Sequence, residues 1–155
     1  PLVYFIILMF IGGCAGSTTC GIKIFRVQIL YQFISNQLKK IIYPRGIFKI
    51  KYQNNNVDEK FMDSIISFIF LYILIFFVVT ALLSLDGLNF ITAISAAATS
   101  ISNVGPGLGD IIGPNGSFSS LSDFSKWVLS AAMILGRLEL FAILVLFIPS
   151  FWRKY

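Results

Sequence analysis

An uncharged apolar run of 22 residues, Ser64 to Leu85, sets the strongest limit on how this chain can fold. A helix over this run is long enough to cross the hydrocarbon core of a bilayer, which is about 30 Å thick. The composition agrees with that setting, since 57% of the 155 residues are hydrophobic and only 12% are charged. The sequence therefore predicts an all-α polytopic membrane protein.

The next apolar run, Asn89 to Ile101, is too short to cross, because its helix would measure only about 20 Å. It runs into SNVGPGLG, Ser102 to Gly109, where glycine and proline oppose further helix. Non-helical backbone at membrane depth persists only where protein buries it or where it lines a watery cavity. We therefore expect a re-entrant half-helix whose C-terminal end and free carbonyls suit a dehydrated cation.

The basic residues predict the orientation of the chain. Eight of the twelve lie between Lys23 and Lys60, none lies between Lys60 and Lys126, and Arg153 and Lys154 close the chain. This is the positive-inside pattern, which makes residues 39–63 a cytoplasmic connector and places the C-terminus in the cytoplasm. The connector could also contact anionic lipid or a cytosolic partner. The net charge of +5 therefore needs no nucleic acid to explain it.

A run of small residues, Gly12 to Gly21, separates two helical patterns, Leu2–Ile11 and Ile22–Leu38. It is interpreted as an intramembrane hinge whose hydroxyls face water or an ion, while small-residue helix packing stays open as the alternative. A phosphate-binding loop is disfavoured because the GxxxxGK[ST] pattern is absent. Cys14 and Cys20 are interpreted as small packing residues. The chain has no His to complete a zinc site, and a disulfide remains open.

Residues Asp123 to Trp152 are expected to form a second spanning helix, with Ser122 or Asp123 as its N-cap. Arg137 lies near the middle of this helix. The free energy needed to place a guanidinium against lipid at that depth is from about 3 to well over 10 kcal/mol. It must therefore face protein or water. One interpretation is an ion pair, or hydrogen bonds to carbonyls, in other parts of the protein. The other is donation to the carbonyls of the Gly12–Gly21 loop.

Catalysis has little support in the sequence. The chain has no His, and its seven acidic residues show no paired-carboxylate spacing. We therefore predict that the chain is not an enzyme, with no catalytic residues and no cofactor. A non-conducting membrane scaffold or subunit fragment is the alternative to a transporter. It is disfavoured because a dipping half-helix has little use without a pore.

The order of helix, dipping half-helix, carbonyl-rich turn and helix is that of one potassium-channel-type pore unit. Two stretches, GGCAGSTTCGIKIFR from Gly12 and SNVGPGLG from Ser102 with MILGRLELFAILVLFIPSFWR downstream, closely resemble the TrkH-type membrane subunits of the Trk, Ktr and HKT potassium transporters. That resemblance implies four pore units around one pore. Residues 1–38 would end the third unit, and residues 64–155 would form the fourth, with its parts at 64–85, 89–101, 102–109 and 123–152.

The resemblance also implies roles for particular residues. The carbonyls of Asn103, Val104 and Gly105 would replace the hydration shell of potassium. Arg137 would reach toward a loop that closes the pore beneath this filter. In that gating loop the matching residues are Gly12, Gly13, Gly16, Ser17, Thr18 and Gly21. Thr19 and Cys20 stand where many relatives have glycines, which leaves the flexibility of the loop open.

The family further implies potassium uptake across the bacterial inner membrane. It also implies a homodimer and a cytosolic nucleotide-binding regulatory subunit resembling TrkA. Because Pro1 already lies inside an apolar run, the chain is expected to be a C-terminal fragment of a longer protein. With one quarter of a filter, it is not expected to conduct alone.

Overall fold

The computed structural model describes residues 2–14, 17, 20–46, 50–52, 55–109 and 111–137. These residues form the helices α1 (Leu2–Phe10), α2 (Ile24–Ile42), α3 (Glu59–Leu85), α4 (Phe90–Ser102) and α5 (Asp123–Arg137), together with the short 3-10 helix η1 (Phe118–Ser120). The strands β1 (Lys51–Tyr52) and β2 (Asn55–Asn56) pair antiparallel within the connector. The helical fold predicted from the sequence is therefore confirmed, with this small hairpin added.

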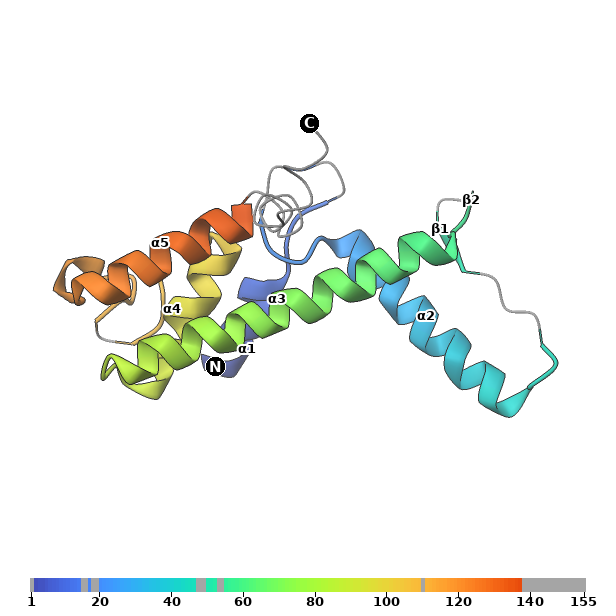
Figure 1. Ribbon diagram of the computed structural model, residues 1–155, viewed down its shortest axis with the longest axis horizontal. Coiled ribbons are helices and arrows are strands. Elements are labelled where there is room, and N and C mark those ends of the chain that lie inside the picture. Colours follow the sequence, from blue (N-terminus) through green and yellow to red (C-terminus); the bar gives the residue numbers. More distant parts are fainter. Residues whose placement is uncertain are drawn as a thin grey trace, which may run out of the picture.

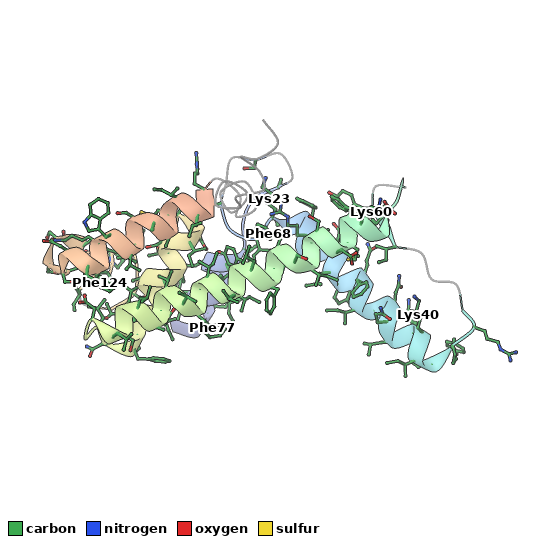
Figure 2. The ribbon with its side chains drawn as sticks, in the orientation of Figure 1. Lys23, Lys40, Lys60, Phe68, Phe77 and Phe124 are labelled. Atoms are coloured by element: carbon green, nitrogen blue, oxygen red, sulfur yellow. The ribbon has the colours of Figure 1, made fainter. Side chains whose placement is uncertain are left out.

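Helix α3 is the long axis of the molecule, and α4 and α5 lie against its C-terminal half (Figure 1). Within the described residues, the one helix long and apolar enough to cross a bilayer is Lys60–Leu85. The helix starts at Glu59, five residues before the uncharged run, and its N-cap, Asp58, places an acidic residue at the positive end of the helix dipole. Its outward side carries large apolar residues such as Phe77, which is 64% exposed (Figure 2).

The short helix α4 is the most enclosed element. It packs against α1, α3 and α5, and ten of its thirteen residues are buried. Those ten are alanine, serine, threonine and a single isoleucine, and small side chains let neighbouring helix backbones approach closely. The buried core around α4 consists of Phe68, Tyr72, Val79, Leu83, Ala93, Ala96, Ala97, Ile101, Ile112, Leu121, Leu129 and Ala132.

Gly136 in α5 lies directly against the backbone of α4. A Cβ atom at this position would lie 1.8 Å from the carbonyl oxygen of Ile101, so no residue larger than glycine fits without a shift of the backbone. On another side of α4, the hydroxyl of Tyr72 in α3 is 2.8 Å from that of Ser102. These contacts fix the C-terminal end of α4, the point from which the predicted filter turn leaves.

Helix α2 forms a second, smaller contact with the N-terminal half of α3. Ile29 packs with Met62 and Ile65, and the guanidinium of Arg26 lies 3.9 Å from the centre of the Phe68 ring. Beyond this contact, α2 leaves α3 at an angle (Figure 1). It continues to Ile42, four residues past the expected end at Leu38, since Lys39 and Lys40 in its last turn suit the negative end of the helix dipole.

The second predicted spanning helix is α5, which is described as far as Arg137. Ser122 is its N-cap, as predicted, because the Ser122 hydroxyl accepts a hydrogen bond from the Ser125 N–H at 3.1 Å. Residues 138–155 lie outside the described part, and with them Glu139, Trp152, Arg153 and Lys154.

Candidate functional site

The candidate site is the turn that follows α4. Asn103 adopts the left-handed conformation, with φ 51° and ψ 43°. Its N–H donates to the carbonyl of Ser100 at 3.2 Å, and the N–H of Val104 donates to the carbonyl of Thr99 at 3.0 Å. This pair of bonds is the Schellman motif, and asparagine tolerates its left-handed position better than most residues. The helix is therefore stopped by a defined turn, as predicted for this stretch.

Three consecutive carbonyl groups of this turn have no partner among the residues that the structure describes. Within the described part of the chain, the carbonyl oxygens of Asn103, Val104 and Gly105 accept no hydrogen bond. All three residues are exposed although the helix before them is buried. Buried or membrane-embedded carbonyls are normally paired, so this strip must be satisfied from outside the described chain, by water or by a cation.

Gly105 is required by the shape of the backbone at this point. Its φ is +115°, a value that residues with a Cβ atom rarely adopt. A Cβ atom here would meet nothing within 4 Å, so the demand for glycine comes from the conformation and not from crowding. A side chain at this position would strain the strip of free carbonyls.

The turn is anchored on two sides. The side-chain amide of Asn103 donates to the carbonyl of Met133 in α5 at 3.1 Å. On the returning limb, the Ser95 hydroxyl lies 3.1 Å from both the backbone nitrogen and the carbonyl oxygen of Leu108. The N–H of Gly107 donates to the Ile112 carbonyl at 2.8 Å. The sequence reasoning did not include Ser95; the available signal was a hydroxyl in an otherwise apolar half-helix.

The glycine-rich loop is closed at its neck by three backbone hydrogen bonds. Gly12 donates to the carbonyl of Ile22 at 2.9 Å, Ile22 to that of Phe10 at 3.0 Å, and Ile24 to that of Gly13 at 3.2 Å. A Cβ atom on Gly12 would lie 2.6 Å from the carbonyl oxygen of Cys20. The ends of the loop are therefore held together. Ser17 lies between them, whereas Gly16 and Thr18 are outside the described residues.

The loop and the turn share a cavity of about 560 Å³. Its walls come from α1, from both ends of the loop and from the turn after α4, Asn103–Leu108. The lining residues are Phe5, Leu8, Met9, Ile11, Cys20, Ser102, Asn103, Val104, Pro106, Gly107, Leu108 and Pro114. Segments some 80 residues apart in sequence, at Cys20 and Asn103, thus face the same space.

Arg137 connects α5 to this loop. Its Nη1 atom is a donor to the Sγ atom of Cys20 at 3.7 Å. The sequence predicts loop carbonyls as acceptors, which stays a prediction, and the contact described here is with the thiol of a loop residue. Cys20 is buried, in agreement with a packing role, but Cys14 is exposed, so the packing interpretation is wrong for Cys14. Both thiols are free.

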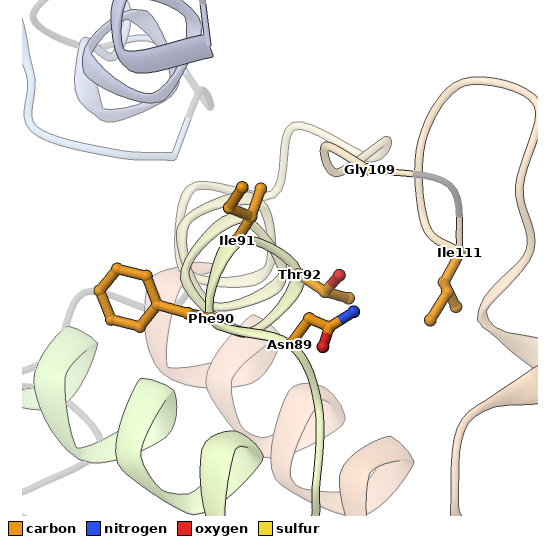
Figure 3. Close-up of a pocket in the computed structure, with 6 residues that line it drawn as sticks. All are labelled: Asn89, Phe90, Ile91, Thr92, Gly109 and Ile111. Carbon is orange, nitrogen blue, oxygen red and sulfur yellow. The ribbon is translucent and has the colours of Figure 1, made fainter.

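A second cavity, of about 350 Å³, lies at the opposite end of α4 (Figure 3). It is lined by Asn89, Phe90, Ile91, Thr92, Gly109 and Ile111. Asp110, the acid expected on this surface, is outside the described residues. No group of three Cys, Asp or Glu side chains placed to hold a metal ion occurs in the described part of the chain.

Asp86 joins the end of α3 to the start of α5. Its Oδ2 atom accepts hydrogen bonds from the hydroxyl of Ser122 and, at 2.6 Å, from that of Ser125. Both bonds favour the ionised carboxylate, the one from Ser122 more strongly, and they hold the pKa of Asp86 below its usual value. The two helices that enclose α4 are therefore linked at one end by a charged group.

Comparison with known proteins places this geometry in a family. The family model described as "TrkH: Cation transport protein" matches residues 2–154. The chain is 44% identical to the Trk system potassium uptake protein TrkI of Halomonas elongata, over 98% of this chain and 31% of the relative. It is 37% identical to TrkH of Escherichia coli, over 94% of this chain and 29% of the relative.

A solved structure is also similar to this chain. The crystal structure of the potassium transporter TrkH from Vibrio parahaemolyticus matches with a TM-score of 0.87 and 36% sequence identity. The match covers 98% of this chain and 32% of that one. The chain thus spans less than a third of the length of the curated relatives named here.

The lowered pKa of Asp86 predicts how the stability of the protein depends on pH. The stabilisation from this carboxylate is complete above its unfolded pKa of about 4, and it is lost as the pH falls through the lower folded pKa. In thermal unfolding of the purified protein, the melting temperature of Asp86→Asn should therefore be below that of the wild type at pH 6. The difference between the two melting temperatures should narrow as the pH falls below about 4.

Asp123→Asn is the matched control for Asp86→Asn. Asp123, at the start of α5, is exposed like Asp86, and its carboxylate pairs with Lys126 at 3.3 Å. Asp123→Asn should lower the melting temperature less than Asp86→Asn does, because surface ion pairs contribute little to stability. If the difference in melting temperature between the wild type and Asp86→Asn stayed constant with pH, the stabilising role assigned to the ionised Asp86 carboxylate would be contradicted.

Proposed function

The chain belongs to the TrkH family of cation transport proteins, and from that premise we propose that it forms part of a potassium uptake transporter. In this proposal the carbonyl oxygens of Asn103, Val104 and Gly105 coordinate the passing ion. The observation that carries the proposal is the strip of three adjacent carbonyls, unpartnered within the described ranges, at the C-terminal end of a buried half-helix. The relatives named for potassium uptake support the choice of ion.

The physical basis is the exchange of hydration for peptide oxygens. A cation that enters the hydrocarbon region loses water, and carbonyl dipoles can replace the lost oxygens. The C-terminal end of α4 adds the negative end of its helix dipole at the same place. Because the surrounding core is apolar, these partial charges are screened less than in water. The site attracts a cation without any acidic side chain.

One strip of carbonyls cannot surround an ion, so we propose that the chain acts within a longer protein. In that arrangement residues 1–38 end the third of four pore units, residues 39–63 connect on the cytoplasmic side, and residues 64–155 form the fourth. The short fraction of each relative that the chain covers supports this view. Potassium flux into vesicles that contain only these 155 residues would contradict it.

We further propose that the loop 12–21 gates the pore. The cavity is lined by both Cys20 and Val104. In this proposal Cys20 therefore lies beside the path of an ion that leaves Val104. The contact between Arg137 and Cys20 would hold the loop in its closed position. A non-conducting scaffold, the competing interpretation, would gain nothing from unpaired carbonyls that face such a cavity.

The cellular setting follows from the same family. We propose an inner-membrane protein with a cytoplasmic C-terminus, since the basic residues between Lys23 and Lys60 fit the positive-inside rule. A homodimer and a cytosolic nucleotide-binding subunit resembling TrkA complete the proposed assembly. The transporter relatives are not enzymes, and no catalytic role is proposed for this chain.

Gly105→Ser in the complete transporter should weaken selectivity for potassium over sodium. The reason is strain, because a side chain at φ +115° shifts the carbonyls on both sides of the residue. The matched control is Gly87→Ser, since Gly87 also has a positive φ, of 88°, and open space around it, but lies in the turn between α3 and α4. Selectivity that is unchanged in Gly105→Ser, measured by isotope flux, would count against the filter assignment.

Arg137→Ala should raise potassium flux, because it releases the gating loop from α5. One hydrogen bond is worth about 0.5–1.5 kcal/mol, so a rise of roughly two- to tenfold is expected. Lys126→Ala removes a cation from the same helix, where it pairs only with Asp123 among the described residues, and should leave flux unchanged. Lower or equal flux in Arg137→Ala at normal expression would show that the arginine is only structural.

A further inference from the structure

We propose that Thr99, in the last turn of α4, is the positioning residue that sets the direction of the filter carbonyls. This inference rests on the proposed function, because it assigns a role within the same filter. Thr99 is 1% exposed and does not itself reach the ion in this proposal. It acts through the two peptide groups that it binds.

Thr99 accepts hydrogen bonds from two consecutive backbone amides of the turn. Its carbonyl oxygen accepts from the N–H of Val104 at 3.0 Å. Its side-chain Oγ1 accepts from the N–H of Gly105, also at 3.0 Å. One buried residue therefore holds both the peptide between Asn103 and Val104 and the peptide between Val104 and Gly105.

The direction of the carbonyls follows from the planarity of the peptide. In a trans peptide the N–H and the C=O point in opposite directions, and the described chain contains no cis bond. Because the N–H of Val104 points back at Thr99, the carbonyl of Asn103 points away from α4. In the same way, the bond from the N–H of Gly105 turns the carbonyl of Val104 outward.

The second of these peptides depends on the Thr99 hydroxyl. Gly105 has no side chain, and a Cβ atom added at this residue would have no neighbour within 4 Å. Packing therefore does not fix the peptide that precedes Gly105. Val104 is 48% exposed and offers little packing of its own. Glycine also permits many backbone conformations. Without Oγ1, the peptide between Val104 and Gly105 is free to rotate and to turn its carbonyl away from the pore.

Ser95 shows that α4 uses the same device on the other limb of the turn. It precedes Thr99 by four residues, so the two hydroxyls lie one above the other on one face of the helix. The Ser95 hydroxyl binds the backbone of Leu108, as the Thr99 hydroxyl binds Gly105. The face of α4 toward the turn is therefore a polar template for the backbone that leaves the helix.

The test compares Thr99→Val with Thr99→Ser in the complete transporter. Valine keeps the volume of threonine but cannot accept a hydrogen bond, whereas serine keeps the hydroxyl. In isotope uptake, Thr99→Val should raise the KM for potassium and lower the potassium-to-sodium ratio by roughly tenfold, while Thr99→Ser stays near wild type. Tenfold corresponds to about 1.4 kcal/mol, within the range for one hydrogen bond.

Thr92→Val is the control for the same chemical change on the same helix. Thr92 is 4% exposed, and its hydroxyl makes no hydrogen bond among the described residues. Thr92→Val should leave both the KM for potassium and the potassium-to-sodium ratio unchanged. Should Thr99→Val fail to fold, as judged by size-exclusion chromatography, Thr99→Cys replaces it, because a thiol is only a weak acceptor.

The outcomes separate this inference from the filter assignment. If Gly105→Ser loses selectivity but Thr99→Val behaves like Thr92→Val, the role of Thr99 is overturned and the filter stands. Equal defects in Thr99→Val and Thr99→Ser would also overturn it, since packing and not the hydroxyl would then matter. If neither Gly105→Ser nor Thr99→Val changes selectivity, the filter assignment fails, and the role of Thr99 fails with it.

Discussion

The structure depends on one constraint, the need to satisfy peptide carbonyls that have no partner in the part of the chain that the structure describes. A polar group left unpaired in an apolar medium costs about 2–7 kcal/mol, so three in succession persist only where water or a cation reaches them. The carbonyls of Asn103, Val104 and Gly105 meet that condition on an exposed strip beside a cavity. The rest of the described fold keeps this strip in place.

Helix α4 is held on several sides so that the turn at its end has little freedom. Tyr72 of α3 is hydrogen-bonded to Ser102 and packs edge-on against Phe10 of α1, with ring centres 6.0 Å apart. Gly136 lets the backbone of α5 reach Ile101, and Asn103 is tied to the carbonyl of Met133. A rigid frame of this kind suits a filter, whose oxygens must not collapse onto a smaller ion or turn away from a larger one.

Much of this arrangement follows from the sequence, because length and backbone chemistry act locally. The uncharged run Ser64–Leu85, the short run before Ser102 and the glycines after it predict a spanning helix, a half-helix and a turn. The contacts of Thr99 and Ser95 could not be predicted in the same way, since they appear only once Asn103 turns the chain back on α4. The sequence directs Arg137 toward the glycine-rich loop, but its contact with the Cys20 thiol joins positions 117 residues apart, and no local pattern encodes that acceptor.

The central claim is that the carbonyl oxygens of Asn103, Val104 and Gly105 hold the transported ion. Anomalous diffraction from crystals of the complete transporter grown with rubidium, which substitutes for potassium, tests it most directly. The account predicts an anomalous peak on the pore axis within coordination distance of these three oxygens. It is contradicted if rubidium binds elsewhere while these carbonyls are hydrogen-bonded to protein groups or lie in bulk water.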